Sequence, residues 1–133
     1  MKTFSRSLLV SLLLIIAAPT FADTKMSAIQ IYVCTFNDDA TAADLFKATK
    51  QWIEAARDTE GGKNIDVAIR FPIATGPDGR GDFRFVTVFP SFAEMGLFRD
   101  AYEGSKVEAV DQEQLNDIAD CGQSSVWEGI STL

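Results

Sequence analysis

Regular alternation of side chains marks several stretches of the chain as β-strands. Residues 29–36 alternate isoleucine and valine with glutamine, tyrosine, cysteine and phenylalanine, so the two sides of this strand differ in chemistry. Residues 65–73 place five branched or aromatic side chains on one side, and residues 83–89 are apolar on both. The glycine-rich segment between these two stretches is typical of a hairpin. A last strand is predicted over residues 124–130.

Apolar side chains that recur every three or four residues predict the helices. Thr41 is placed to cap a helix over residues 42–57, which ends at the glycine pair that follows it. Serines at 91 and 105, each followed three residues later by glutamate, have the spacing of a capping box. They predict one helix that reaches about residue 102 and a second, shorter helix after it. The expected apolar stripe of the first helix is Leu45, Phe46, Thr49, Trp52, Ile53 and Ala56.

The predicted order of elements is strand, helix, strand, strand, helices, strand. This βαββαβ order predicts an α+β ferredoxin-like domain with four antiparallel strands in spatial order 4-1-3-2 and the helices on one face. Pro72 favours an edge position for the second strand, since proline cannot donate to a neighbouring strand. The same topology brings the end of the first strand beside the start of the last, so Cys34 is expected to lie near Cys121.

The first 22 residues have the layout of a cleaved secretory signal peptide. Lys2 and Arg6 precede an apolar run over residues 8–18, and in Thr20-Phe21-Ala22 small residues stand at the two positions that a signal peptidase reads, which predicts a cut after Ala22. The run is shorter than the ~18 residues that a membrane span needs, so no membrane association is expected after cleavage. We therefore predict one mature domain, residues 23–133, in the periplasm or secreted. In that oxidising setting a Cys34–Cys121 disulfide is expected, and a reactive thiol is the alternative.

Charge and composition exclude several classes of function. Cleavage removes two basic residues and no acidic residue, which takes the net charge from −7 to −9. Such a chain is not suited to bind nucleic acid or anionic membranes. The sequence contains no histidine, which removes serine–histidine and cysteine–histidine catalysis, a proximal haem histidine and the usual zinc sites. We expect no cofactor, and the sequence favours a protein that is not an enzyme.

In the order of its elements, residues 28–130 resemble the dimeric α+β barrel superfamily, in which two ferredoxin-like subunits press their sheet faces together. The resemblance implies a homodimer with a cavity either between sheet and helices or between the two sheets. Many members that act on aromatic or haem substrates rely on histidine, which this chain lacks. No catalytic residue is therefore carried over from the superfamily.

The face of the sheet that the helices leave open is the expected place of function. We expect Ile29, Ile31 and Val33 to lie under the helices, together with the apolar side of residues 65–71. Trp127 has the parity of Cys121 and is therefore expected on the face of Cys34. The third strand is ambiguous because both of its sides are apolar. Aromatic rings beside arginines favour a small planar or anionic ligand; the candidate binding residues are Tyr32, Phe36, Arg70, Arg84 and Trp127.

These observations lead to three hypotheses. The first is an exported small-ligand-binding or protein-interaction domain that uses its open sheet face. The second is a cofactor-independent enzyme of the dimeric α+β barrel type, with a carboxylate or Tyr32 as acid or base. The third is a purely structural periplasmic protein.

Aspartates are expected to gather at one end of the sheet, where the first strand ends, the hairpin turns and the last strand begins. Oxygen-rich groups of this kind suit calcium, although the spacing matches no EF-hand loop. The other interpretation is that these residues are helix caps and solvated turn residues. The candidates for a calcium site are Asp38, Asp39, Asp82 and Asp120, with Asp78 and Asp117 nearby.

Overall fold

The computed structural model describes residues 25–74 and 81–131. Its elements follow the predicted order, and β1, β2 and β4 differ from the predicted strands mainly in length; no helix in the described ranges is long and apolar enough to cross a membrane. The signal-peptide prediction for residues 1–22 falls outside the described residues. The elements are β1 Lys25–Phe36, α1 Ala42–Arg57, β2 Asp66–Arg70, β3 Phe83–Phe89, α2 Phe92–Asp100, α3 Lys106–Val110, a π-helical turn Asp111–Leu115, α4 Asn116–Ile118 and β4 Ala119–Ser131.

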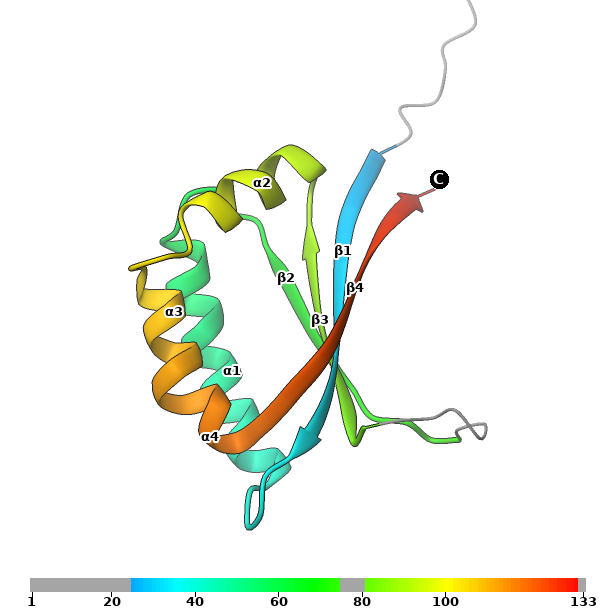
Figure 1. Ribbon diagram of the computed structural model, residues 1–133. Coiled ribbons are helices and arrows are strands. Elements are labelled where there is room, and N and C mark those ends of the chain that lie inside the picture. The colour runs from blue at the N-terminus through cyan, green and yellow to red at the C-terminus, as the bar shows by residue number, and fades with distance from the viewer. Residues whose placement is uncertain (1–24, 75–80, 132–133) are drawn as a thin grey trace, which may run out of the picture.

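The four strands form one antiparallel sheet in the order β2-β3-β1-β4, with the helices gathered on one face (Figure 1). This is the predicted order read from the other edge, and the α+β ferredoxin-like fold is confirmed. β2 is an edge strand, as Pro72 indicated, and its pairing ends at Arg70. We call the face against the helices the covered face and the opposite face the open face.

Side-chain caps start the helices where the sequence predicts. The Thr41 hydroxyl accepts the Asp44 N–H at 3.3 Å, and the Asp44 carboxylate accepts the Thr41 N–H at 3.1 Å, which completes a capping box. The Thr41 hydroxyl also donates to this carboxylate, and that bond, together with the one from the Thr41 N–H, holds the pKa of Asp44 below its usual range. Ser91 and Ser105 cap α2 and α3 in the same way, each accepting the N–H three residues later at 3.2 Å.

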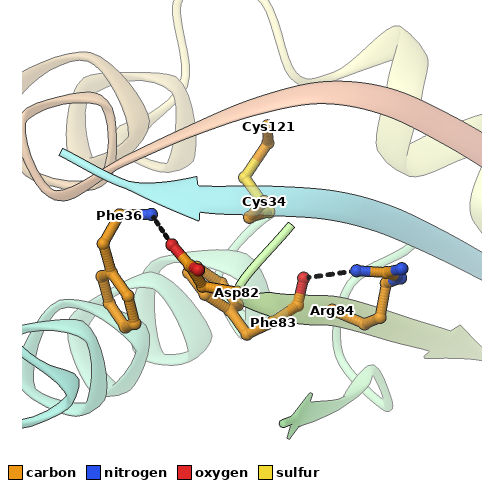
Figure 2. Close-up of a disulfide and its surroundings, with 6 residues drawn as sticks. All are labelled: Cys34, Phe36, Asp82, Phe83, Arg84 and Cys121. Carbon is orange, nitrogen blue, oxygen red and sulfur yellow. Dashed lines mark hydrogen bonds between the residues drawn. A yellow bond between two sulfur atoms is a disulfide. The ribbon is translucent and has the colours of Figure 1, made fainter. Parts of the chain in front are cut away.

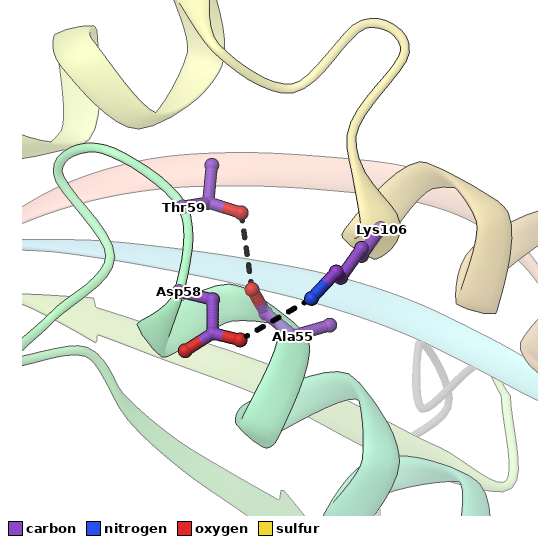
Figure 3. A network of polar contacts seen from close by, with 4 residues as sticks. All are labelled: Ala55, Asp58, Thr59 and Lys106. Carbon is purple, nitrogen blue, oxygen red and sulfur yellow. Dashed lines mark hydrogen bonds and ion pairs between the residues drawn. The ribbon is translucent and has the colours of Figure 1, made fainter.

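Polar contacts join the end of α1 to the start of α3 (Figure 3). The Thr59 hydroxyl donates to the Ala55 carbonyl at 3.0 Å, and the Lys106 ammonium lies 3.6 Å from the Asp58 carboxylate. Both charged groups are well exposed, so this ion pair contributes at most about 1 kcal/mol. It links the C-cap residue of α1 to the first residue of α3.

The pairing of β1 with β3 corrects our assignment of the two faces. Directly paired residues of an antiparallel ladder share a face, and Tyr32 pairs with Phe85, whose ring lies 5.4 Å from that of Trp52 on α1. Tyr32 and Cys34 therefore face the helices, whereas we predicted the opposite. The open face carries the residues predicted to be covered, Ile29, Ile31 and Val33, with Val86 and Val88 of β3. On β2 the prediction is correct, because Val67 and Ile69 face the helices and Arg70 does not.

A bulge in β4 explains why Trp127 and Cys121 were wrongly placed on the same face. Val33 pairs with Gln123 and Thr35 with Asp120, so two residues of β4 lie opposite Cys34 alone. These two are Cys121 and Gly122. Because the extra residue reverses the alternation, Cys121 reaches Cys34 on the covered side while Trp127 lies on the open face, paired with Ile29.

Aromatic side chains supply the largest residues of the core. Phe83, Phe85 and Phe89 are buried on β3 and pack against the buried stripe of α1 and against Met95 and Phe98 of α2. The stripe of α1 differs from the prediction at Phe46, which is 53% exposed and lies edge-on to Phe71. Alanines take its place; the buried residues of α1 are Leu45, Ala48, Thr49, Trp52, Ala55 and Ala56.

Candidate functional site

A cavity of about 490 Å³ lies between the covered face of the sheet and the helices. We call it the central cavity. Its walls come from β1, β3 and α1, from α2 and the turn that follows it, and from the segment that leads from the π-helical turn into β4. The lining residues are Gln30, Tyr32, Leu45, Trp52, Phe83, Phe85, Thr87, Phe89, Phe98, Arg99, Tyr102, Asp111, Gln112, Leu115, Asn116, Ala119 and Cys121.

Aromatic side chains form a large part of the lining and pack against one another. The Trp52 ring meets that of Phe85 edge-on at 5.4 Å and lies 6.0 Å from that of Phe98. Phe98 in turn packs 5.2 Å from Phe89. Edge-on and tilted contacts of this kind are the favoured arrangement of aromatic pairs. The cavity thus presents preformed apolar surfaces to a bound molecule.

A carboxyl and a phenol meet at the helical wall of the cavity. The Tyr102 hydroxyl donates a hydrogen bond to the Asp111 carboxylate. Burial is the main cause that raises the pKa of Asp111, with the charge of Glu108 acting in the same direction; the Tyr102 hydroxyl and the Trp52 indole oppose it. Burial and the bond to Asp111 raise the pKa of Tyr102 as well. Asp111 begins the π-helical turn, a feature frequently found at functional sites.

Among the described residues, Arg99 is the only cationic residue that lines the cavity and Asp111 is the only anionic one. Its guanidinium donates to the neutral Gln30 side chain at 2.9 Å, and no ion pair to it is found among the described residues. Both charges act on the Tyr32 hydroxyl. Burial is the main cause that raises the pKa of Tyr32, while Arg99 lowers this pKa and Asp111 raises it. Tyr32 therefore lies within the electrostatic reach of both charged groups.

The predicted disulfide forms at the edge of the cavity. Cys34 and Cys121 are bonded, with their Cα atoms 4.1 Å apart, and neither cysteine is free. Figure 2 shows the bridge between β1 and β4 beside Asp82, whose carboxylate accepts the Phe36 N–H at 2.9 Å. Because Cys121 lines the cavity, the bridge fixes the end of the wall segment that begins at Asp111.

The five candidate binding residues are divided between three places. Tyr32 lines the cavity. Phe36 packs at the end of the sheet, its ring 4.9 Å from that of Phe83. Arg70 and Arg84 lie directly opposite each other on the open face, where Trp127 is 58% exposed. They do not form one site.

The candidate calcium residues have other roles or lie apart. The described residues contain no group of three or more acidic or cysteine side chains that could hold a metal ion. Asp82 is used in the bond to the Phe36 N–H. Asp78 lies outside the described residues.

Three polar cavity residues, Arg99, Tyr102 and Asp111, were missed in the sequence. A signal for Asp111 was present, because Val107, Asp111 and Leu115 recur at four-residue spacing and place a carboxylate in an otherwise apolar stripe. An ionisable group at a core position of a helix is rarely without a role. No comparable signal marks Arg99, which continues the helix as any exposed residue would.

Comparisons with known proteins identify a shared fold and no family. A scan against protein-family models finds no match, and a search of curated proteins finds no relative. Among solved structures the chain is similar to a hydroxynitrile lyase from Passiflora edulis, with 8% identity and a TM-score of 0.50 over 81% of this chain and 94% of the other. At that identity the likeness concerns the fold alone.

Two further structures are similar at lower scores. One is a dimeric ferredoxin-like protein of unknown function from Thermobifida fusca, with 14% identity and a TM-score of 0.45 over 80% of this chain and 92% of the other. The other is a dimeric protein of unknown function and ferredoxin-like fold from Bacteroides fragilis, with 9% identity and a TM-score of 0.42 over 80% and 97% of the two chains.

Proposed function

We propose that the chain is a small-molecule-binding protein and that the central cavity is its binding site. The observation that carries this proposal is the cavity itself. Its volume of about 490 Å³ falls within the range of ~300–1,000 Å³ that is usual for ligand pockets. Like those pockets, it combines apolar walls with a few convergent polar groups, here supplied by Tyr32, Tyr102, Asp111 and Arg99.

A pair of glutamines on the π-helical turn tests the proposal. Gln112 lines the cavity, whereas Gln114 on the same turn does not. Calorimetry with neutral ring compounds (phenol, cyclohexanol and 2-naphthol) is expected to give saturable binding to the oxidised protein. Gln112→Phe should weaken it by about tenfold or more by filling the cavity, while Gln114→Phe leaves it unchanged. Absence of saturable binding, or equal effects of the two substitutions, would contradict the proposal.

A second copy of the chain is the proposed partner of the open face. Branched side chains from β1 and β3 line this face, and no helix of the described residues covers it. Arg70 and Arg84 lie directly opposite each other there, an arrangement of like charges that an acidic partner group would relieve. Burial against another sheet would remove this apolar surface from water, which is the dominant favourable term in association.

We also propose that the protein is exported, which accounts for its disulfide. Disulfides persist in oxidising compartments and are rare in the cytosol, and the Cys34–Cys121 bridge fits a mature chain of residues 23–133 in the periplasm or medium. Amino-terminal sequencing of protein recovered from the exported fraction is expected to begin at Asp23. A chain that begins at Met1 in that fraction would contradict cleavage.

Asp111 favours a cofactor-independent enzyme as the second candidate function. A carboxyl whose pKa is raised by burial is better suited to accept and return a proton than an exposed one, and the Tyr102 hydroxyl would hold it in place. Hydrogen–deuterium exchange at an acidic C–H of a bound ring compound would report such proton transfer. Asp111→Asn should abolish the exchange while binding persists; exchange that survives the substitution would exclude this role.

A further inference from the structure

Arg99 and Asp111 are the two charged residues of the central cavity, and no ion pair to either of them is found among the described residues. Arg99 donates to the neutral Gln30 amide, and Asp111 accepts from the neutral Tyr102 hydroxyl. The ion pair of the described residues lies elsewhere, between Lys106 and Asp58. An arginine has five N–H donors and a carboxylate about four acceptor positions, so both groups retain capacity for a bound molecule.

The surfaces between these two charges are apolar or weakly polar. Trp52, Phe85 and Phe98 supply aromatic rings, and Tyr32 lies within electrostatic reach of both Arg99 and Asp111. A molecule that entered with a single negative charge would be attracted to Arg99 and repelled by Asp111, so its orientation would be fixed. The group that it presents to Asp111 must then be a hydrogen-bond donor.

We propose that the ligand of the central cavity is a small hydroxy acid with a flat apolar body, its carboxylate bound by Arg99 and its hydroxyl donating to Asp111. The guanidinium fork matches a carboxylate, with two parallel N–H···O bonds. The body of the ligand packs against the aromatic rings. This inference rests on the proposed function, since it assigns the chemistry of the same cavity.

Matched probes separate the two polar contacts. 4-Hydroxybenzoate carries both groups, benzoate carries only the acid, and phenol carries only the hydroxyl; 2- and 3-hydroxybenzoate report the spacing. Binding is measured by calorimetry, and by Trp52 fluorescence in a Trp127→Phe background that leaves a single tryptophan. 4-Hydroxybenzoate, or one of its isomers, is expected to bind at least about tenfold more tightly than benzoate or phenol, because one hydrogen bond to a charged group contributes ~1.5–3 kcal/mol.

Two substitutions assign the contacts to residues. Arg99→Met keeps the apolar stem and should weaken both acids by about 10- to 100-fold while phenol is unaffected. Asp111→Asn should weaken phenol and the hydroxybenzoate and leave benzoate unchanged or bound more tightly, since a like charge is removed. Arg57→Met, at the exposed end of α1 away from the cavity, is the control and should change none of the affinities.

The outcomes distinguish this inference from the proposed function. Phenol and cyclohexanol that bind as tightly as the hydroxybenzoates, or an Arg99→Met protein that loses phenol and benzoate equally, would overturn the hydroxy-acid assignment and leave a cavity for neutral molecules. Absence of binding by any ring compound, neutral or acidic, would overturn both. Circular dichroism and thermal unfolding of each variant verify that it is folded.

Discussion

Strand β3 presents large rings to the covered face of the sheet, whereas it presents branched aliphatic side chains to the open face. On β3 the two sets alternate, with Phe83, Phe85 and Phe89 toward the helices and Val86 and Val88 away from them. Both faces are apolar, so hydropathy alone does not tell them apart. The difference is one of size and shape.

That difference has a consequence on each side of the sheet. Rings on β3 reach far enough to meet Trp52 and Phe98, and they line a cavity where they do not fill the space under the helices. On the other side, the branched side chains of β3 are shorter and project less far from the strand. The proposed ligand site and the proposed dimer contact therefore lie on opposite faces of one sheet.

The disulfide is the feature whose loss should weaken the covered face most. Cys34→Ser with Cys121→Ser removes a bridge across a sequence separation of 87 residues. Loop-closure entropy for a loop of this length predicts a loss of about 4–5 kcal/mol in the free energy of unfolding. Urea denaturation of the oxidised wild type and the double variant measures it, and wild type in reductant is the control. A loss below about 1 kcal/mol would show that packing at the bulge, and not the bridge, holds β1 to β4.

The aromatic set of the covered face should be the next most sensitive. Phe83 is fully buried and packs against the rings of Phe36 and Phe71, and its replacement by alanine is expected to cost about 3–5 kcal/mol in the free energy of unfolding. Phe92→Ala is the matched control, since Phe92 is 48% exposed on α2 and should change stability by no more than about 0.5 kcal/mol. Equal losses for the two variants would mean that the covered face is not the core of the domain.

Neighbouring residues of β4 allow the open face to be tested against the covered one. Trp127 points to the open face and Val126 to the other side, and both are exposed in the single chain. If a second copy covers the open face, Trp127→Lys should weaken self-association by about 2 kcal/mol or more, because tryptophans in interface centres often dominate binding. Val126→Lys should have little effect. Sedimentation equilibrium measures both, and a wild type that remains monomeric at high concentration would remove the basis of the comparison.

The topology could be predicted from the sequence, but the assignment of the two faces could not. Element order, which follows from periodicity and helix caps, was sufficient for the topology because both depend on local spacing, and the proximity of the two cysteines then followed from it. The face of β1 was predicted wrongly because isoleucine and valine are compatible with either side, and the helices select the side on which rings are available from β3. Trp127 was predicted to share a face with Cys34 and Cys121 because the bulge at Gly122 gives no periodic signal in the sequence.

The polar groups of the cavity were harder to predict than its walls. Arg99 and Asp111 are brought together with Tyr32 by three separate elements, and no spacing in the chain connects them. Only the carboxylate in the apolar stripe of residues 107–115 could have been noticed. The site therefore depends on tertiary structure in a way that the fold does not.

The smallest effect expected is a pH dependence that comes from Asp111. Burial raises its pKa above the ordinary 3.8, against the opposing influence of the Tyr102 hydroxyl and the Trp52 indole. The folded protein then holds this proton more tightly than the unfolded chain does. The stability so gained is fully present below pH 3.8 and is lost as the pH rises through the higher folded pKa. Asp111→Asn lacks this loss and still accepts the Tyr102 hydroxyl through its amide oxygen.

The variant should therefore gain stability relative to wild type as the pH rises from about 3 to 8, measured by urea denaturation across the series. Asp117→Asn on α4 is the control for removal of an exposed carboxylate. The groups that act on Asp111 come from different elements: Glu108 from α3, Tyr102 from the turn after α2 and Trp52 from α1. Tyr102 and Trp52 lower the pKa of Asp111, whereas burial raises it. The sign of the stability difference between the variant and wild type, as the pH rises, therefore tests which of the two effects is larger. A difference that stays flat or falls with pH would mean that the hydrogen bonds prevail, that Asp111 ionises at no higher pH in the folded protein than in the unfolded chain, and that this part of the cavity wall is anionic at neutral pH.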